Sequence, residues 1–141
     1  MTYTNLVKKA IKLAYNLHKG ETDEYGLPII YNVYSIANNI DNEYGFCAAL
    51  LYMAVENKKT TLENLKKDFP FEVTDTIFML KTDDSLAYPD YIRRIKINPI
   101  ATQIKIAEIN NRISLLELKE DKGKIKIELE KYQFALNILK K

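Results

Sequence analysis

The stretch AALLYMAVENKKTTLENLKKDF, residues 48–69, contains the clearest helix signals of this chain. It begins as a continuous apolar run, turns polar after residue 56, and resumes with Thr60 and Glu63 at the spacing of a helix-capping box. Asn42 precedes the apolar run and is a favourable N-cap residue. The stretch therefore predicts two helices, one from residue 43 to about residue 57 and one ending near residue 67.

Helical periodicity also covers most of the chain on either side. The polar segment KGETDEYGLP (19–28) holds two glycines and a proline and predicts a loop. No strand alternation is evident, so we expect an all-α fold, a single helical bundle of about seven or eight helices over residues 1–141. The remaining helices are expected at residues 3–18, 33–40, 71–80 and 99–118, after Pro89, and beyond Gly123, with Asn32 and Asn98 as N-caps.

Composition excludes several classes of protein. The 141 residues are 47% hydrophobic and 28% charged, which is typical of a globular domain. A net charge of +2 gives no electrostatic case for nucleic acid or a membrane surface as a partner. The single cysteine, Cys47, cannot form an internal disulfide, and one His and one Cys cannot supply most of a zinc site. With no secretory signal and no apolar run near the roughly 20 residues of a membrane span, a soluble cytoplasmic protein is expected.

One carboxylate lies on the helical stripe formed by Ile100, Ile104, Glu108, Asn111 and Leu115. Glu108 comes four residues after Ile104 and seven before Leu115, so it points at or near the core. A buried carboxylate needs a partner, a proton or a cavity. The alternative is a solvated position at a helix rim, and the same alternative holds for Glu56. His18 is better explained as a structural or exposed histidine than as a ligand.

Three segments, taken in order, resemble the HD-domain phosphohydrolases. They are LHKGETDEYGLPIIYNVYSIA (17–37), the stretch 48–69, and IKIAEINNR (104–112). The family pattern reads H-x-G-Q, G-x-P-Y-I-x-H-P, A-L-L-H-D-x-V-E-D-T and V-K-L-A-D-x-x-x-N. The branch that looks closest acts on the alarmones guanosine tetra- and pentaphosphate, (p)ppGpp. The resemblance covers residues 10–116 and implies a helical HD-domain fold.

The resemblance also locates the family's metal site, and this chain departs from it. In the family a histidine, an adjacent His-Asp pair and a later aspartate hold a divalent metal, usually manganese. The corresponding residues here are Asn32, Tyr52, Met53 and Glu108. A thioether is mismatched to manganese, a phenol resists ionisation, and an amide offers only a neutral oxygen. We therefore expect no metal cofactor.

The family's catalytic positions are altered as well. Its Glu-Asp pair, which assists the attacking water, corresponds to Glu56 and Asn57, and an amide cannot take up a proton. The family's later asparagine falls on Arg112, beside Asn111, and its glutamine falls on Glu21. Without a metal to polarise phosphate and acidify water, efficient hydrolysis is not expected.

These replacements predict what the cleft contains. Tyr52 is expected to donate a hydrogen bond to Glu108 in place of metal coordination. Lys105, Arg112, Arg93 and Arg94 are candidate phosphate partners, although the Arg93-Arg94 pair is better explained as a solvated helix face. The residues expected to line the cleft or bind a ligand are Asn32, Tyr52, Met53, Glu56, Lys105, Glu108 and Arg112.

Three functions are compatible with this sequence. The first is a pseudoenzyme retained as a regulatory module that binds a nucleotide, or a protein through some of its ten tyrosines. The second is a divergent phosphohydrolase acting on (p)ppGpp or another nucleotide, in which Asn32, Glu56 and Glu108 together hold magnesium. The third is a structural remnant with no small-molecule ligand. An apolar, filled cleft would favour the third, and an open cleft with a bound anion would oppose it.

Overall fold

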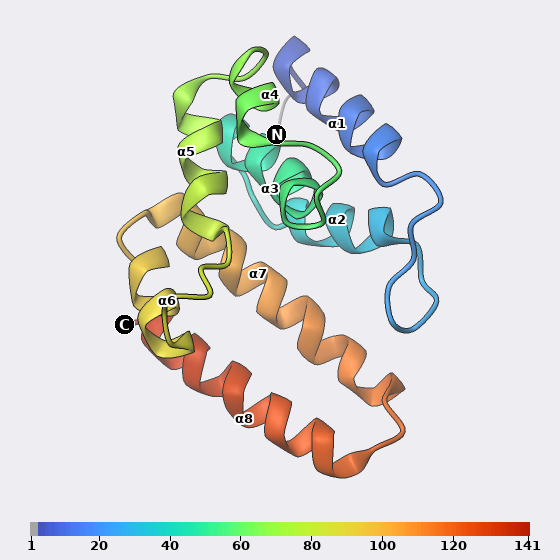
Figure 1. The fold of residues 1–141 in the computed structure, drawn as a ribbon, viewed down its shortest axis with the longest axis vertical. Helices are drawn as coiled ribbons and strands as arrows, with labels where there is room; N and C mark the ends of the chain where they lie inside the picture. Colours follow the sequence, from blue (N-terminus) through green and yellow to red (C-terminus); the bar gives the residue numbers. More distant parts are fainter. Residues whose placement is uncertain (1–2) are drawn as a thin grey trace.

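Helix α3 (Glu43–Glu56) lies at the centre of the fold because its sequence is apolar around nearly its whole circumference (Figure 1). Ten of its 14 residues are buried. Helices α1 (Asn5–Leu17), α2 (Ile29–Ala37) and α5 (Phe71–Leu80) pack against it. The structure is a computed structural model that describes residues 3–141.

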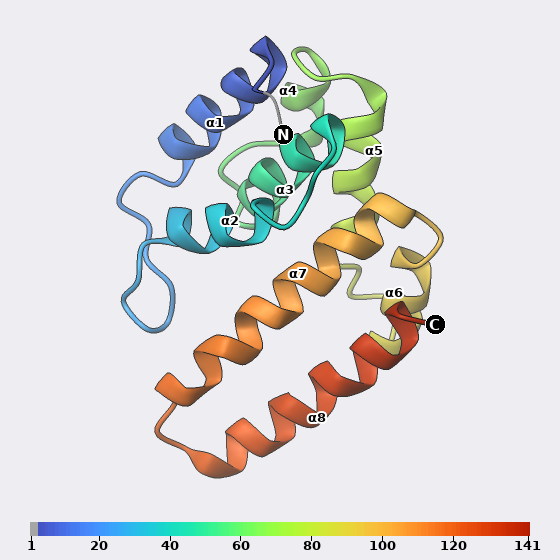
Figure 2. The same cartoon turned by 180° about the vertical axis from the view of Figure 1, so that it is seen from behind.

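The second half of the chain forms a helical pair that closes one side of this group. Helix α7 (Pro99–Leu115) contacts α2, α3 and α5, and α8 (Lys122–Leu139) runs back along it in the antiparallel direction (Figure 2). The short 3-10 helix η1 (Leu116–Leu118) joins the two. The remaining helices are α4 (Leu62–Lys66) and α6 (Tyr88–Ile95), of which α6 packs on α8.

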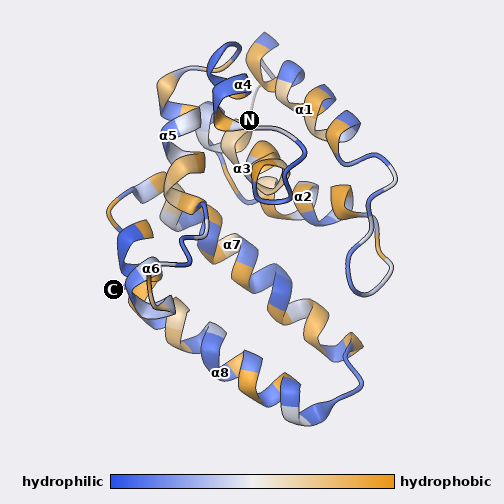
Figure 3. Cartoon of the chain, in the orientation of Figure 1, coloured by the Kyte–Doolittle hydropathy of each residue, from blue (hydrophilic) through white to orange (hydrophobic). Residues whose placement is uncertain are grey.

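Residues 3–141 form eight α-helices and no β-strand, which confirms the predicted all-α bundle. Hydrophobic residues dominate α3 in the interior, whereas α8 carries many hydrophilic ones (Figure 3). Of these helices, none combines the length and the apolarity needed to cross a bilayer.

Several helix boundaries follow the predicted signals. The Asn42 side chain accepts a hydrogen bond from the backbone N–H of Gly45 and caps α3, as predicted. Asn98 likewise caps α7 by accepting from the N–H groups of Ile100 and Ala101. Pro89 lies in the first turn of α6 and Pro99 in that of α7, where the missing N–H costs no helical hydrogen bond.

Three predicted boundaries are wrong. Asn32 does not cap α2, because the helix begins earlier, at Ile29, and leaves this amide inside it. Thr61, rather than Thr60, caps α4 by accepting from the N–H of Asn64. Gly123 does not separate helices; it lies in the first turn of α8, which Asp121 caps.

Candidate ligand-binding cleft

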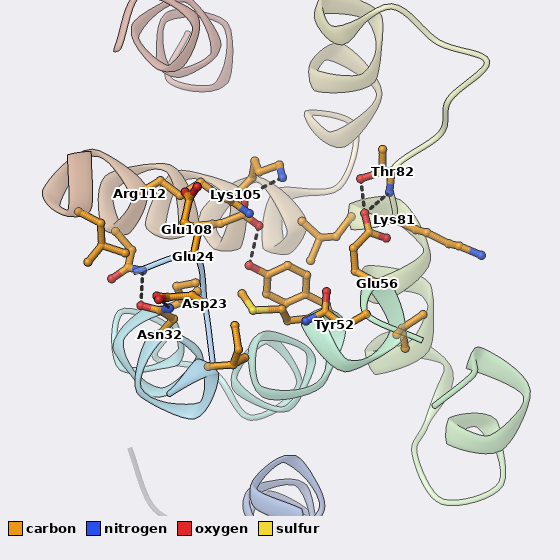
Figure 4. Close-up of a pocket in the computed structure, with 18 of the residues that line it drawn as sticks. Asp23, Glu24, Asn32, Tyr52, Glu56, Lys81, Thr82, Lys105, Glu108 and Arg112 are labelled. Atoms are coloured by element: carbon orange, nitrogen blue, oxygen red, sulfur yellow. Dashed lines mark hydrogen bonds and ion pairs between the residues drawn. The ribbon is translucent and has the colours of Figure 1, made fainter. Parts of the chain in front are cut away.

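A cavity of about 340 Å³ opens between α7 and the α2–α3 pair, and residues of α5, α6, α8 and the loop before α2 complete its wall (Figure 4). This volume is in the range of small-molecule sites. The structure brings together every residue that the sequence predicts for the cleft. Asn32, Tyr52, Met53, Glu56, Lys105, Glu108 and Arg112 all line the cavity.

Glu108 is the buried centre of a polar network in this cavity, which Arg112, with a side chain that is 52% exposed, joins from the solvent side. Glu108 itself is only 6% exposed, and each of its two carboxylate oxygens accepts a hydrogen bond. Tyr52 donates its hydroxyl to Oε1 at 2.6 Å, which confirms the predicted hydrogen bond. Oε2 accepts from Lys105 Nζ at 3.0 Å and from Arg112 Nε at 3.1 Å (Figure 4). Two cations and one phenol therefore share one carboxylate.

The charges in this network hold one another in their ionised forms. Burial alone would raise the pKa of Glu108, but Lys105 and Arg112 outweigh it and lower the pKa to about 2. Burial would likewise lower the pKa of Lys105, but the Glu108 carboxylate raises it above the usual value. For Tyr52, burial and the Glu108 charge act together and raise the pKa well above 10.0, so the phenol stays protonated and can donate.

Glu56, the other carboxylate singled out by the sequence, has different partners. Its Oε1 accepts from the backbone N–H of Thr82 at 3.2 Å and from the Thr82 hydroxyl. Glu56 therefore attaches the end of α3 to the loop that follows α5. Its neighbour Asn57 is the C-cap of α3, and its amide lies 3.4 Å from the carboxylate of Glu21.

Comparison with known proteins identifies the fold through structure alone. No protein-family model and no curated protein matches the chain. A solved structure does match it: a metazoan ortholog of SpoT that hydrolyses ppGpp and plays a role in starvation responses. The TM-score is 0.78 at 20% sequence identity, over 99% of this chain and 88% of that chain. The chain shares the fold of this ppGpp hydrolase.

The groups at the positions where the sequence resemblance implies a metal do not suit manganese. The oxygen of Asn32 accepts from Asn111 Nδ2 at 3.2 Å, while its own Nδ2 donates to Asp23 at 2.8 Å. The carboxylate of Glu108 is neutralised by its two cations. Within residues 3–141, no three His, Cys, Asp or Glu side chains form a group able to hold a metal. A hard divalent cation would have to displace a lysine and an arginine to reach its one carboxylate.

The predicted phosphate partners fall into two groups. Lys105 and Arg112 line the cavity, but both form ion pairs with Glu108. Arg93 and Arg94 are not among the described residues that line it. Arg93 pairs with Asp90 at the exposed surface of α6. Arg94 pairs instead with Asp83 and donates to the backbone carbonyls of Met79 and Lys81.

Sequence reasoning missed part of the cavity wall. Asp23, in the loop 19–28, accepts from the N–H groups of Tyr25 and Leu27 and from Asn32. This turn is the signal that the loop offered, because aspartate side chains commonly accept from backbone two residues on. Glu128 and Tyr132 come from α8, beyond the segment that resembles the hydrolases, and no local pattern indicates their position.

Proposed function

We propose that this chain is a degenerate HD-domain protein that lacks the metal-dependent (p)ppGpp pyrophosphohydrolase activity of its relatives and serves as a regulatory binding module. The network of Tyr52, Lys105, Glu108 and Arg112 carries this proposal, because Tyr52 and Glu108 stand at two of the four expected metal positions and Lys105 and Arg112 pair with Glu108 there. Hydrolysis in this family needs a metal that polarises phosphate and lowers the pKa of its bound water. Here the side chains neutralise one another instead.

The cavity favours a small molecule as the ligand over a protein partner. Its volume of about 340 Å³ lies in the range of small-molecule sites, although the large side chains of Tyr52 and Met53 line it. Tyr25, Tyr91 and Tyr132 also line it, so part of the chain's tyrosine content faces the cavity rather than a protein interface. Amide groups of Asn32, Asn57 and Asn111 supply donors and acceptors for an uncharged ring. These features favour the nucleotide over the protein partner, the two ligands that the sequence left open.

The hydrolytic half of the proposal is tested with ppGpp, the substrate of the structural neighbour. The purified chain is incubated with ppGpp and either manganese or magnesium, and the products are separated by ion-exchange chromatography. We expect no turnover above the protein-free blank. The matched control carries Asn32→His, Tyr52→His, Met53→Asp and Glu108→Asp, and is expected to gain manganese binding. Metal-dependent turnover by the wild type, lost in Glu56→Gln, would establish the divergent hydrolase instead.

The binding half is tested by titrating labelled protein with guanosine and guanosine nucleotides and following backbone amide resonances. We expect saturable shifts that cluster around the cavity, at Asn32, Tyr52 and Glu108. Resonances of the outer surface of α8, such as Ile127, serve as the internal reference because this side chain is 69% exposed. Shifts confined to that surface, or none at millimolar ligand, would contradict a binding role for the cleft.

A further inference from the structure

Lys105 and Arg112 are arranged as an anion site that already holds an anion. Their nitrogens approach one oxygen, Glu108 Oε2, at 3.0 and 3.1 Å, and both residues line the cavity. Charge-assisted hydrogen bonds of this kind are the ones with which lysine and arginine bind phosphate oxygens. Glu108 Oε2 therefore takes the place of an external phosphate oxygen: it supplies the negative charge and accepts the hydrogen bonds of the two cations.

Glu108 is held in this position by more than its charge. It belongs to the same turns of α7 as Lys105 and Arg112, three residues from one and four from the other, so the contact costs no long-range ordering. Tyr52 on α3 fixes the second carboxylate oxygen. Lys105 is only 8% exposed, so its ammonium group requires a buried anion at this point.

Apart from Lys105, Glu108 and Arg112, the described residues that line the cavity include four carboxylates, those of Asp23, Glu24, Glu56 and Glu128, and one cation, Lys81, which lies beside Glu56 (Figure 4). Asp23 and Glu56 line it, and neither pairs with a lysine or arginine anywhere in residues 3–141. Glu24 and Glu128 also line it and share a single cation, Lys119. A polyphosphate entering the cavity would meet uncompensated carboxylates and would compete with Glu108 for the two cations.

We propose that Glu108 is the built-in occupant of an anion site formed by Lys105 and Arg112, and that it makes the cleft selective against phosphate groups at this point. The inference rests on the proposed function, in which the cleft binds a ligand without hydrolysing it. It specifies the ligand class: the part of the ligand that reaches Tyr52 and Glu108 is uncharged or cationic. Any phosphate groups of a nucleotide lie outside this site.

The test removes the built-in anion and supplies an external one. Glu108→Gln keeps the acceptor for Tyr52 but frees the two cations. Thermal unfolding is followed with rising inorganic pyrophosphate, against sodium chloride at matched ionic strength. We expect pyrophosphate at millimolar concentration to raise the melting temperature of Glu108→Gln by roughly 3 °C or more, while leaving the wild type unchanged. If Glu108→Gln is unfolded in buffer, the same response is followed as a gain of folded fraction by circular dichroism.

Two further variants make the result specific. Glu128→Gln removes the same charge from the same cavity wall but leaves Lys105 and Arg112 paired, so it should not respond to pyrophosphate. Glu108→Gln combined with Arg112→Gln should lose most of the response. No response in Glu108→Gln, an equal response in Glu128→Gln, or an equal response in the wild type would each overturn the proposal. Turnover of ppGpp by the wild type would overturn the proposed function instead, and is measured separately.

Discussion

At the scale of single residues, Glu108 shows how hydrogen bonds and ion pairs stabilise a carboxylate in the interior of this bundle. An unpaired charge at a residue that is 6% exposed would cost several kcal/mol, but this one accepts from a phenol, an ammonium and a guanidinium. Removing a single partner from such a group is therefore costly even where the whole network adds little net stability.

The hydrogen bond from Tyr52 is the simplest part of the network to isolate. Tyr52→Phe removes only the hydroxyl and leaves Glu108 Oε1 without its donor, so we expect a loss of roughly 1.5–3 kcal/mol in the free energy of unfolding. Urea denaturation at neutral pH measures it. Tyr31→Phe is the matched control, because this side chain is 68% exposed, and its effect should stay within about 0.5 kcal/mol. Equal effects of the two substitutions would show that the buried hydrogen bond contributes nothing.

The ionised state of Glu108 also predicts a dependence of stability on acid. Its pKa is about 2 in the folded protein against an ordinary value of 4.5, so the unfolded chain takes up this proton first as the pH falls. The contribution to the free energy of unfolding is therefore complete above about pH 4.5 and is lost progressively toward pH 2. We expect wild-type stability to fall by about 3 kcal/mol more than that of Glu108→Gln across this window. Parallel acid-induced losses in the two proteins would contradict it.

At the residue scale, the sequence predicted correctly what depends on spacing within a single helix. The spacing of Ile104, Glu108 and Leu115 was sufficient to place the carboxylate inward, and the resemblance then supplied Tyr52 as its partner. The same reasoning took Lys105 and Arg112 for free phosphate partners. It missed that both lie within one helical turn of Glu108, where the nearest anion is intramolecular.

At the scale of helices, the junction of α3 and α7 requires a glycine. A Cβ atom on Gly45 would lie 2.5 Å from Asn42 Oδ1 and 2.9 Å from Ile100 Cγ2. The first of these atoms belongs to the side chain that caps α3, and the second to the first turn of α7. Gly45 thus lets the capped end of α3 approach the helix that carries Lys105 and Glu108.

This close approach predicts the outcome of replacing the glycine. Alanine would favour the helix by up to about 1 kcal/mol on propensity alone. We nevertheless expect Gly45→Ala to lower the free energy of unfolding by roughly 1–3 kcal/mol through overpacking and disturbance of the Asn42 cap. Gly123→Ala is the comparison, since in α8 the added Cβ would meet only Asp121 Oδ1, at 3.3 Å, and its effect should stay within about 1 kcal/mol. Chemical denaturation of both variants tests this, and a stabilised Gly45→Ala would contradict it.

Helix boundaries show where sequence signals suffice. Phe71–Leu80 forms the predicted helix because its apolar period is unbroken between a proline and a loop. The prediction that Asn32 caps α2 was wrong because asparagine favours both capping and polar contacts within a fold. Here its contacts to Asp23 and Asn111 decide its role. The prediction that Gly123 separates two helices was wrong because α8, which Asp121 already caps, tolerates a glycine in its first turn.

At the scale of the whole molecule, a single core extends from α1 to α8 and encloses the one cysteine. Cys47 on α3 is fully buried, and burial raises the pKa of its thiol to about 12. Thiol reagents attack the thiolate, so reactivity requires both exposure and a lower pKa. Solvent reaches this position only when the bundle around α3 opens.

Cysteine reactivity therefore reports the cooperativity of the bundle. We expect Cys47 in the native protein to resist a colorimetric thiol reagent at pH 8 and to react fully in denaturant. The midpoint of labelling against urea concentration should coincide with that of helix loss measured by circular dichroism. Rapid labelling in buffer would show that α3 becomes accessible by local opening, and would contradict a single cooperative core.

Metal binding decides whether the cleft of this ppGpp-hydrolase fold still holds a metal site. Metal-free protein is titrated calorimetrically with manganese and, in parallel, with magnesium. We expect no saturable heat up to millimolar metal, because Glu108 is neutralised by Lys105 and Arg112 and the other expected metal positions hold Asn32, Tyr52 and Met53. Saturable one-to-one binding that Glu108→Ala weakens would contradict it, and would mean that the metal site has been rebuilt.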